Sequence, residues 1–337
     1  MPMPDVPKAR RQTPPVIKPP ALRPGDRIGI VAPASYFKRE LFDRGLAALR
    51  RMEYEPVFLD TIFDRDLYFA GTAERRAREL EQMFARDDLQ ALLCARGGYG
   101  ANYLLPHVDL DLIRKHPKVF VGYSDVTCLL TWFLDAAGLV TFHGPMLTGD
   151  FARQHGLNEM SWMAATAGNS NWELASHQVF GLNPMVPGRG EGIFYGGCLS
   201  IVVASFGTPY EAKTEGKLLF LEDVGAKPYQ IDRMLMQMKL AGKFQGVRGI
   251  IFGEMMDCIQ SPDQPYTLQE VVHRIVGDLG VPIAYGLRSG HVSRENATLP
   301  FGVKAALTVS QEAVRVEFLE SAVAPRGFAT SGDRPTG

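Results

Sequence analysis

Residues 119–131 read VFVGYSDVTCLLT, an apolar run that passes through Gly-Tyr-Ser-Asp directly into a second apolar-rich segment. The first part, Val119 to Gly122, is typical of a buried strand, and the segment from Val126 to Ala137 is typical of a helix. A strand that leads straight into a helix is characteristic of folds in which parallel strands alternate with helices. This junction therefore predicts an α/β protein.

The same alternation extends to both sides of this junction. Strand-like apolar runs alternate with helical periods, at residues 28–32, 37–52, 56–59, 73–84, 91–94 and 140–142. This rhythm predicts a parallel sheet. It breaks at Gly144-Pro145, so we expect an N-terminal α/β domain that carries the 119–131 junction and spans residues 23–168.

The second half begins after a stretch rich in Asn, Gly, Ser and Pro, which predicts a linker at residues 169–190. Short apolar runs and helical periods resume from residue 191, and residues 299–318 alternate as antiparallel strands do. We therefore expect a smaller C-terminal α/β domain with a mixed sheet over residues 191–323.

The composition is that of a folded protein without a strong net electrostatic field. The chain has 337 residues, a length that favours two domains, and is 46% hydrophobic and 22% charged. Its formal net charge of -1 gives no reason to expect nucleic acid or an anionic membrane as partner. A small, locally recognised substrate fits this composition better.

The two ends of the chain, residues 1–22 and 324–337, are expected to be flexible extensions. The first lacks the apolar core of a secretory signal, and no run of about 18 apolar residues occurs that could cross a membrane. These observations predict a cytoplasmic protein.

No cofactor or metal site is expected from the sequence. The four cysteines (Cys94, Cys128, Cys198 and Cys258) stand singly, and no pair of cysteines or histidines has a metal-ligand spacing. The glycine-rich turn in residues 93–100, LCARGGYG, lacks the Gly-Lys-Ser/Thr of a phosphate-binding loop. We therefore predict that the protein binds neither a metal nor a nucleotide cofactor.

Ser124 is the first candidate for catalysis. A turn between a strand and a helix lifts a serine hydroxyl above the edge of the sheet, and the N–H of the next residue, Asp125, can stabilise an oxyanion. However, Val126 stands where the hydrolase elbow usually has a second glycine. On spacing alone, a capping serine at a helix start is the more common arrangement.

The glycine-rich turn offers a second candidate element. Gly97 and Gly98 allow positive φ angles and close approach of the backbone, so their N–H groups can face a ligand or an oxyanion. Arg96 at the strand end can pair with a substrate carboxylate, and an ordinary surface ion pair is an equally good interpretation.

An acid and a base complete the set of candidates. Glu222 and Asp223 follow the apolar run at residues 218–221, and strand ends are where α/β active sites assemble. We assign function to Glu222 and a supporting role to Asp223. His291 lies in a polar loop where it can titrate, and His143, at another strand end, is its rival as the general base.

Taken together, these segments resemble the LD-carboxypeptidase family, the muramoyltetrapeptide carboxypeptidases, from Pro24 to about Val316. The motifs occur in the family's order, as RPGDRIGIVAPAS (23–35), ARGGYGA (95–101), GYSD (122–125), TFHGPM (141–146), EGIFYGGCLS (191–200), ASFGTPYE (204–211), LLFLEDVGAKPYQIDRMLMQM (218–238), GIIFGE (249–254) and SGHVSRENATLPFG (289–302). One departure is Cys198, where the family commonly has Asn after the two glycines.

The resemblance implies a serine peptidase with a Ser124, Glu222 and His291 triad that spans two domains, the first of them similar to class I glutamine amidotransferases. It also implies an oxyanion hole from Asp125 with Gly97 or Gly98. Arg96 and Tyr123 are expected to contact the substrate.

The substrate that the resemblance implies is a cytoplasmic murein tetrapeptide, from which such enzymes release the terminal D-alanine during peptidoglycan recycling. Members of this family commonly form homodimers, so the resemblance also implies a homodimer.

Two other functions stay open. A sibling that resembles the microcin C immunity peptidases would use the same triad on an aminoacyl-nucleotide and would need an aromatic platform, for which Trp172 is a candidate. A non-catalytic protein that clamps a peptide would not need all three triad residues. A glutamine amidotransferase would need a cysteine in place of Ser124.

Overall fold

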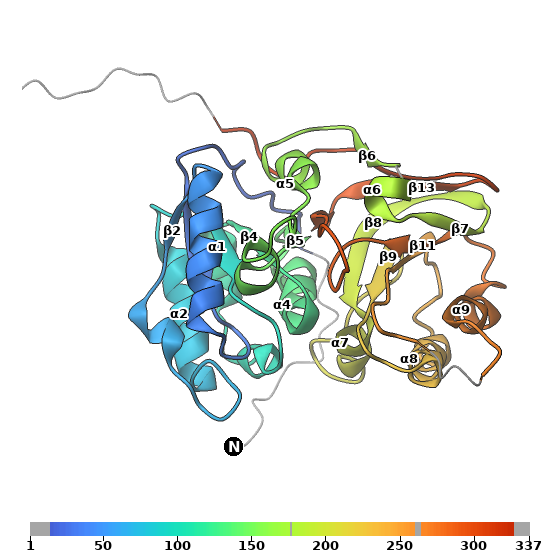
Figure 1. Cartoon of the computed structure of the whole chain (residues 1–337), viewed down its shortest axis with the longest axis horizontal. Coiled ribbons are helices and arrows are strands. Elements are labelled where there is room, and N and C mark those ends of the chain that lie inside the picture. Colours follow the sequence, from blue (N-terminus) through green and yellow to red (C-terminus); the bar gives the residue numbers. More distant parts are fainter. Residues whose placement is uncertain (1–13, 176, 260–263, 327–337) are drawn as a thin grey trace, which may run out of the picture.

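The chain forms two β-sheets, each flanked by helices, in the computed structural model shown in Figure 1. It describes residues 14–175, 177–259 and 264–326. The first sheet has the strand order β12-β5-β4-β3-β1-β2, and the second has the order β6-β14-β13-β8-β9-β10-β11-β7. The expected pair of α/β domains, the first mostly parallel and the second mixed, is confirmed.

The N-terminal sheet consists of parallel strands connected by helices. Its strands are β1 (Arg27–Val31), β2 (Glu55–Val57), β3 (Ala91–Cys94), β4 (Val119–Gly122) and β5 (Thr141–His143), with α1 (Arg39–Arg51), α2 (Ala73–Ala85), α3 (Leu110–Lys115) and α4 (Thr127–Trp132) in the connections. Every residue of β3 and β4 is buried, as in a sheet covered on both faces. That burial explains why both strands are apolar runs without alternation.

Shorter turns and one further helix complete this domain. They are η1 (Asp60–Phe63), η2 (Ala101–Leu104), η3 (Ser124–Val126), η4 (Phe133–Ala137), η5 (Leu147–Phe151) and α5 (Glu159–Thr166). The helix expected over residues 126–137 is thus divided between α4 and the wider turn η4.

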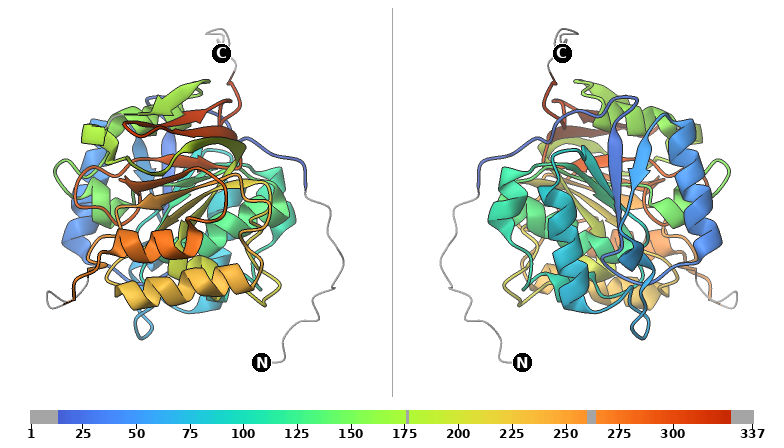
Figure 2. Two further views of the ribbon diagram at one scale, coloured as in Figure 1. Left: turned by 90° about the vertical axis from the view of Figure 1, so that its right-hand side faces the viewer. Right: turned by 90° about the vertical axis from the view of Figure 1, so that its left-hand side faces the viewer.

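The C-terminal sheet has a parallel centre and antiparallel sides. Its centre is β8 (Gly188–Cys198), β9 (Lys217–Glu222), β10 (Gly249–Gly253) and β11 (Ile283–Leu287), and its sides are β6 (Trp172–Leu174), β7 (Asn183–Val186), β13 (Lys304–Val309) and β14 (Val314–Phe318). The helices of this half are α6 (His177–Phe180), α7 (Leu199–Ala204), α8 (Pro228–Leu240) and α9 (Leu268–Val276). Figure 2 shows α8 and α9 side by side below this sheet.

The segment expected to be a linker, residues 169–190, contains β6, α6 and β7, and both strands join the C-terminal sheet. Residues 14–22 of the N-terminal extension also make regular contacts. Ile17 donates its N–H to the carbonyl of Gly138 at 2.8 Å and accepts from Val140 at 2.9 Å. Residues 1–13 and 327–337 lie outside the described part of the chain, and the exact domain borders stay a prediction.

One strand from the end of the chain joins the two halves. β12 (Leu299–Phe301) pairs antiparallel with β5 of the N-terminal sheet, while β11 and β13 on either side of it in sequence belong to the C-terminal sheet. Residues 288–298 therefore cross from one sheet to the other. Among the described helices, none is long and apolar enough to cross a lipid bilayer.

Candidate active site

Ser124 lies at the carboxyl end of β4, in a backbone conformation that few serines adopt. Its φ angle is +61°, in the left-handed region, where an L residue is strained by about 1–2 kcal/mol. A Cβ on Gly122, the last residue of β4, would lie 2.8 Å from a methyl of Val126, so the turn can close only over a glycine. The capping interpretation is wrong, since neither η3 nor α4 begins with a side-chain cap.

The glycine-rich turn packs directly against this serine. A Cβ on Gly97 would lie 2.8 Å from the Cβ of Ser124 and 3.1 Å from its Oγ. Gly98 has a φ of +102° and leaves no room for a side chain beside Ser35. A ligand bound at the Ser124 hydroxyl can therefore also come close to the backbone of residues 97–98.

Asp125 holds the serine turn and the glycine turn together through its side chain. Its Oδ2 accepts the N–H of Ala101 at 2.7 Å. Burial raises the pKa of Asp125 to about 6, although the Ala101 hydrogen bond and the charge of Arg76 act in the opposite direction. The side chain is thus a structural clamp, and only its backbone N–H remains a candidate for the oxyanion site.

Glu222 and His291 form a hydrogen-bonded pair at the end of β9. The Nδ1 of His291 lies 2.8 Å from Oε2 of Glu222, and the same oxygen accepts the backbone N–H of His291 at 3.0 Å. Burial by itself raises the pKa of the fully buried Glu222, but the imidazoles of His291 and His143 outweigh it, so that the pKa falls to about 2. Burial likewise lowers the pKa of His291, and the charge of Glu222 more than compensates, leaving that pKa above its ordinary value of 6.5.

His143, the rival base, lies behind this pair. Its imidazole is fully buried between Phe220 and Phe301, and its Nδ1 lies 3.0 Å from the Ser289 hydroxyl. Its Nε2 faces Glu222 Oε1 at 3.8 Å, and burial lowers its pKa. Burial therefore favours the neutral form of the enclosed His143, whereas the His291 side chain retains 17% exposure.

Tyr123 connects the serine turn to the histidine. Its ring packs edge-on against the imidazole of His291 with 5.1 Å between the centroids, and it immediately precedes Ser124. Through the Tyr123 ring, the turn that carries Ser124, with Gly97 packed against it, meets the Glu222 and His291 pair at the seam between the two sheets. Arg96 is exposed and donates to the carbonyl of Tyr36 at 3.0 Å.

Cys198 and Asp223 lie beside the Glu222 and His291 pair. Cys198 ends β8 directly opposite Glu222 in the register of β8 and β9, and its N–H donates to the Thr127 hydroxyl at 3.1 Å. Asp223 accepts the N–H of Ser200 at 2.8 Å at the start of α7, and its supporting role in the site stays a prediction.

Two residues of the loop that carries His291, Gly290 and Asn296, were not identified as functional from the sequence. Gly290 has a φ of +89°, and a Cβ there would lie 2.6 Å from Cδ of Glu222. Buried Asn296 accepts the N–H of Gly290 at 2.9 Å and donates to its carbonyl at 3.0 Å. The glycine directly before a candidate histidine was the only available signal, because the Asn296 contact depends on how the loop folds back.

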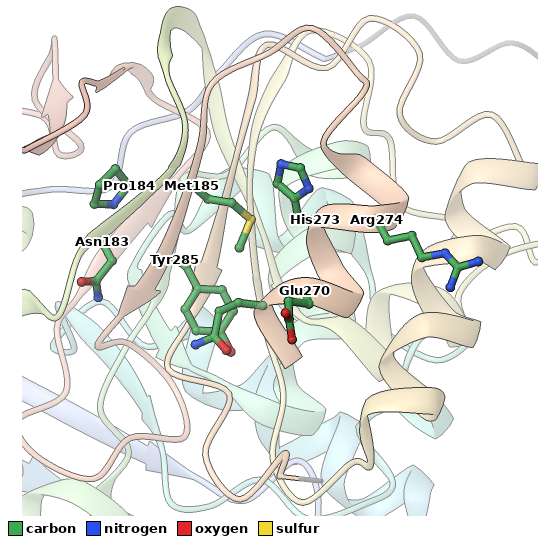
Figure 3. A pocket seen from close by; sticks show the side chains of 8 residues that line it. Asn183, Pro184, Met185, Glu270, His273, Arg274 and Tyr285 are labelled. Carbon is green, nitrogen blue, oxygen red and sulfur yellow. The ribbon is translucent and has the colours of Figure 1, made fainter. Parts of the chain in front are cut away.

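A pocket of about 460 Å³ lies away from this cluster on the C-terminal domain, where β7, β11 and α9 meet (Figure 3). Met185, His273, Arg274 and Tyr285 are among its lining residues, and none of the predicted site residues is. We therefore place the candidate active site at the seam between the sheets.

A serine, a histidine and a buried carboxylate are the residue types of the serine-hydrolase triad. The sequence pattern of the LD-carboxypeptidase N-terminal domain matches residues 28–144, and that of the LD-carboxypeptidase C-terminal domain matches residues 191–307. The chain belongs to the LD-carboxypeptidase family.

Its relatives cover most of its length. A Bacillus subtilis protein named "Probable murein peptide carboxypeptidase" is 36% identical over 305 residues, covering 89% of this chain and 94% of the relative. The murein tetrapeptide carboxypeptidase of Pseudomonas aeruginosa is 29% identical, covering 83% and 92%. The microcin C7 self-immunity protein MccF of Escherichia coli is 28% identical, covering 87% and 93%.

Solved structures have the same fold. MccF in its wild-type apo state superposes with a TM-score of 0.83 at 24% identity, covering 91% of this chain and 100% of that chain. A muramoyltetrapeptide carboxypeptidase from Oxalobacter formigenes superposes with a TM-score of 0.77 at 26% identity, covering 88% and 99%.

Proposed function

We propose that this protein is a cytoplasmic serine carboxypeptidase that hydrolyses an L,D peptide bond and releases the terminal D-alanine of a murein tetrapeptide. The observation that carries the proposal is the Glu222 and His291 pair, 2.8 Å apart, beside the strained Ser124 turn. The names of the Bacillus and Pseudomonas relatives support the substrate class.

In the proposed mechanism, Ser124 Oγ attacks the carbonyl carbon of the scissile bond. His291 accepts the hydroxyl proton at Nε2, because its Nδ1 faces Glu222. The N–H of Asp125 and an N–H of the Gly97-Gly98 turn bind the oxyanion that forms. His291 then returns the proton to the nitrogen of the departing D-alanine.

The second half of the reaction hydrolyses the acyl-enzyme. A water molecule gives its proton to His291 and attacks the acyl carbon, and the serine hydroxyl recovers a proton when the product leaves. Glu222 stays ionised throughout and holds the histidine in one tautomer, which its low pKa of about 2 favours.

A microcin C immunity peptidase is the second candidate, and the identity to MccF keeps it under test. The candidate for the aromatic platform that a nucleobase would need, Trp172, is half-buried. Trp172 stacks on Phe318 with 4.4 Å between ring centroids and is part of β6. Since Phe318 covers one face of the Trp172 ring, we rank the nucleotide substrate second.

The decisive experiment incubates the purified protein with murein tetrapeptide and, separately, with an aminoacyl sulfamoyl adenosine. We expect free D-alanine from the tetrapeptide only, and none with the Ser124→Ala protein. Cleavage of the nucleotide conjugate alone would assign the protein to the microcin group. Peptide binding without cleavage by wild-type protein would assign it to the non-catalytic group.

The assembly is part of the same proposal. We expect a homodimer, since two-fold dimers are the commonest symmetric assembly. Light scattering of the purified protein measures the molar mass directly, and a mass of one chain would contradict the expectation.

A further inference from the structure

Cys198 places a thiol next to two groups of the proposed triad. One ligand atom each of Cys198, Glu222 and His291 lies within 4.8 Å of the other two. The register of the sheet fixes this proximity, because Cys198 on β8 stands directly opposite Glu222 on β9. Thiolate, carboxylate and imidazole are the three ligand types that Zn²⁺ binds in proteins.

The carboxylate of this group has unused bonding capacity. Glu222 is fully buried, and its Oε1 has no hydrogen-bond partner among residues 14–175, 177–259 and 264–326. The Nε2 of His143 lies 3.8 Å from that oxygen, which is too long for a hydrogen bond. A buried carboxylate oxygen without a partner is a favourable ligand for a cation.

The charges of the group also match a divalent ion. A thiolate, a carboxylate and a neutral imidazole together carry two negative charges, which one Zn²⁺ neutralises inside a buried site. Tetrahedral zinc with bonds of about 2.0–2.3 Å needs ligand atoms about 3.3–3.8 Å apart. Because the ligand atoms lie within 4.8 Å of one another, no pair of them needs to approach by more than about 1–1.5 Å to reach this geometry.

From these observations we infer that Cys198, Glu222 and His291 form an inhibitory binding site for Zn²⁺ and similar soft divalent cations. The ion displaces the proton of the Cys198 thiol into solvent and takes the lone pair of the His291 imidazole, with water as its fourth ligand. Because the metal occupies the base and its carboxylate, bound zinc and peptide cleavage exclude each other. The inhibition rests on the function proposed above, but the binding does not.

The test measures binding without activity, on the full-length Ser124→Ala protein with Co²⁺ as the probe. We expect one Co²⁺ per chain, a thiolate-to-cobalt charge-transfer band in the near ultraviolet, and loss of the band when Zn²⁺ is added. Cys198→Ala in that background should remove the band. Cys258→Ala, which deletes a buried thiol outside the three-residue group, should keep it.

Glu222→Gln keeps the thiol and the imidazole and serves as the second variant. It should weaken Co²⁺ binding by at least about tenfold. Absence of the band in the Ser124→Ala protein, or its persistence after Cys198→Ala in a variant with unchanged circular dichroism, would overturn the inference. If Cys198→Ala fails to fold, an undiminished affinity in Glu222→Gln overturns it equally. With active protein, micromolar Zn²⁺ should inhibit wild type and Cys258→Ala, and spare Cys198→Asn.

Discussion

His291 donates two hydrogen bonds to a single oxygen of Glu222, one from its ring Nδ1 at 2.8 Å and one from its own backbone N–H at 3.0 Å. The backbone bond fixes where the loop meets the carboxylate, and the ring bond fixes which way the imidazole turns. Together they leave Nε2 as the ring nitrogen that, in the proposed mechanism, exchanges a proton with Ser124.

Glu222→Gln should change the pH dependence of catalysis. In wild type, kcat/KM should rise with pH as His291 loses its proton, with a midpoint above 6.5 because Glu222 raises that pKa. The variant should move this midpoint to lower pH and reduce the plateau by about 10³-fold or more, since the ring loses its fixed tautomer. Rates of D-alanine release from pH 5 to 9 measure both effects. An unmoved midpoint would show that another group is the base.

Replacing Ser124 by glycine and by alanine separates strain from chemistry. Both variants should lose at least about 10³-fold in D-alanine release, because each lacks the proposed nucleophile. Glycine accepts a φ of +61° without strain, so Ser124→Gly should be more stable than Ser124→Ala by about 1 kcal/mol. Urea unfolding of the two proteins gives this difference. Equal stabilities would mean that the turn relaxes when the side chain changes.

Gly290→Ala should disturb the carboxylate that the histidine depends on. The new Cβ would lie 2.6 Å from Glu222 Cδ, so the Glu222 and His291 hydrogen bonds must distort and kcat should fall by about 10²-fold. Gly25→Ala is the matched control, because Gly25 has a φ of +85° and open space around it. The Gly25→Ala protein should lose only the stability that the backbone strain costs, and it should keep its activity. Equal losses of activity in both variants would contradict the role of the contact.

Asp125→Asn should flatten part of the pH dependence of stability. Folded Asp125 has a pKa of about 6, above the roughly 3.9 of an unfolded aspartate, so the folded state holds the extra proton between these values. Wild-type stability should therefore fall as pH rises through this window, by on the order of 2–3 kcal/mol from this group. The amide can still accept from Ala101 but does not titrate. The free energy of unfolding of the variant, minus that of wild type, should thus be larger at pH 7.5 than at pH 4.5, and equal differences would disprove the assignment.

The sequence predicts the N-terminal domain well because its strands are buried on both faces and its helices have amphipathic periods. Residues 91–94 and 119–122 are recognisable without any knowledge of their neighbours. Residues 172–174 and 183–186 are not, since each is a three- or four-residue strand whose paired residues lie 97 to 146 positions further along the chain. The sheet that β12 joins could not be predicted either, because local alternation indicates a strand but not its partner.

The candidate site divides in the same way. Ser124, Glu222 and His291 stand at ends of apolar runs or in a polar loop, where residue type and position in the pattern suggest chemistry. The contacts of Gly290 and Asn296 come from a loop that folds back on itself, and spacing along the chain carries no information about them. The backbone strain at Ser124 is likewise a property of the folded turn, and the amino-acid sequence of the turn does not reveal it.

The loop that carries His291 is anchored at both ends in different sheets, at β11 on one side and at β12 on the other. It acts as a strap across the seam, and any hinge motion that parted the two domains would have to stretch it or peel β12 away from β5. We therefore expect the substrate to enter and leave without any change in the relative position of the two domains. The overall dimensions of the protein should then be the same with and without bound substrate. Small-angle X-ray scattering of the free protein and of its substrate complex should give the same radius of gyration.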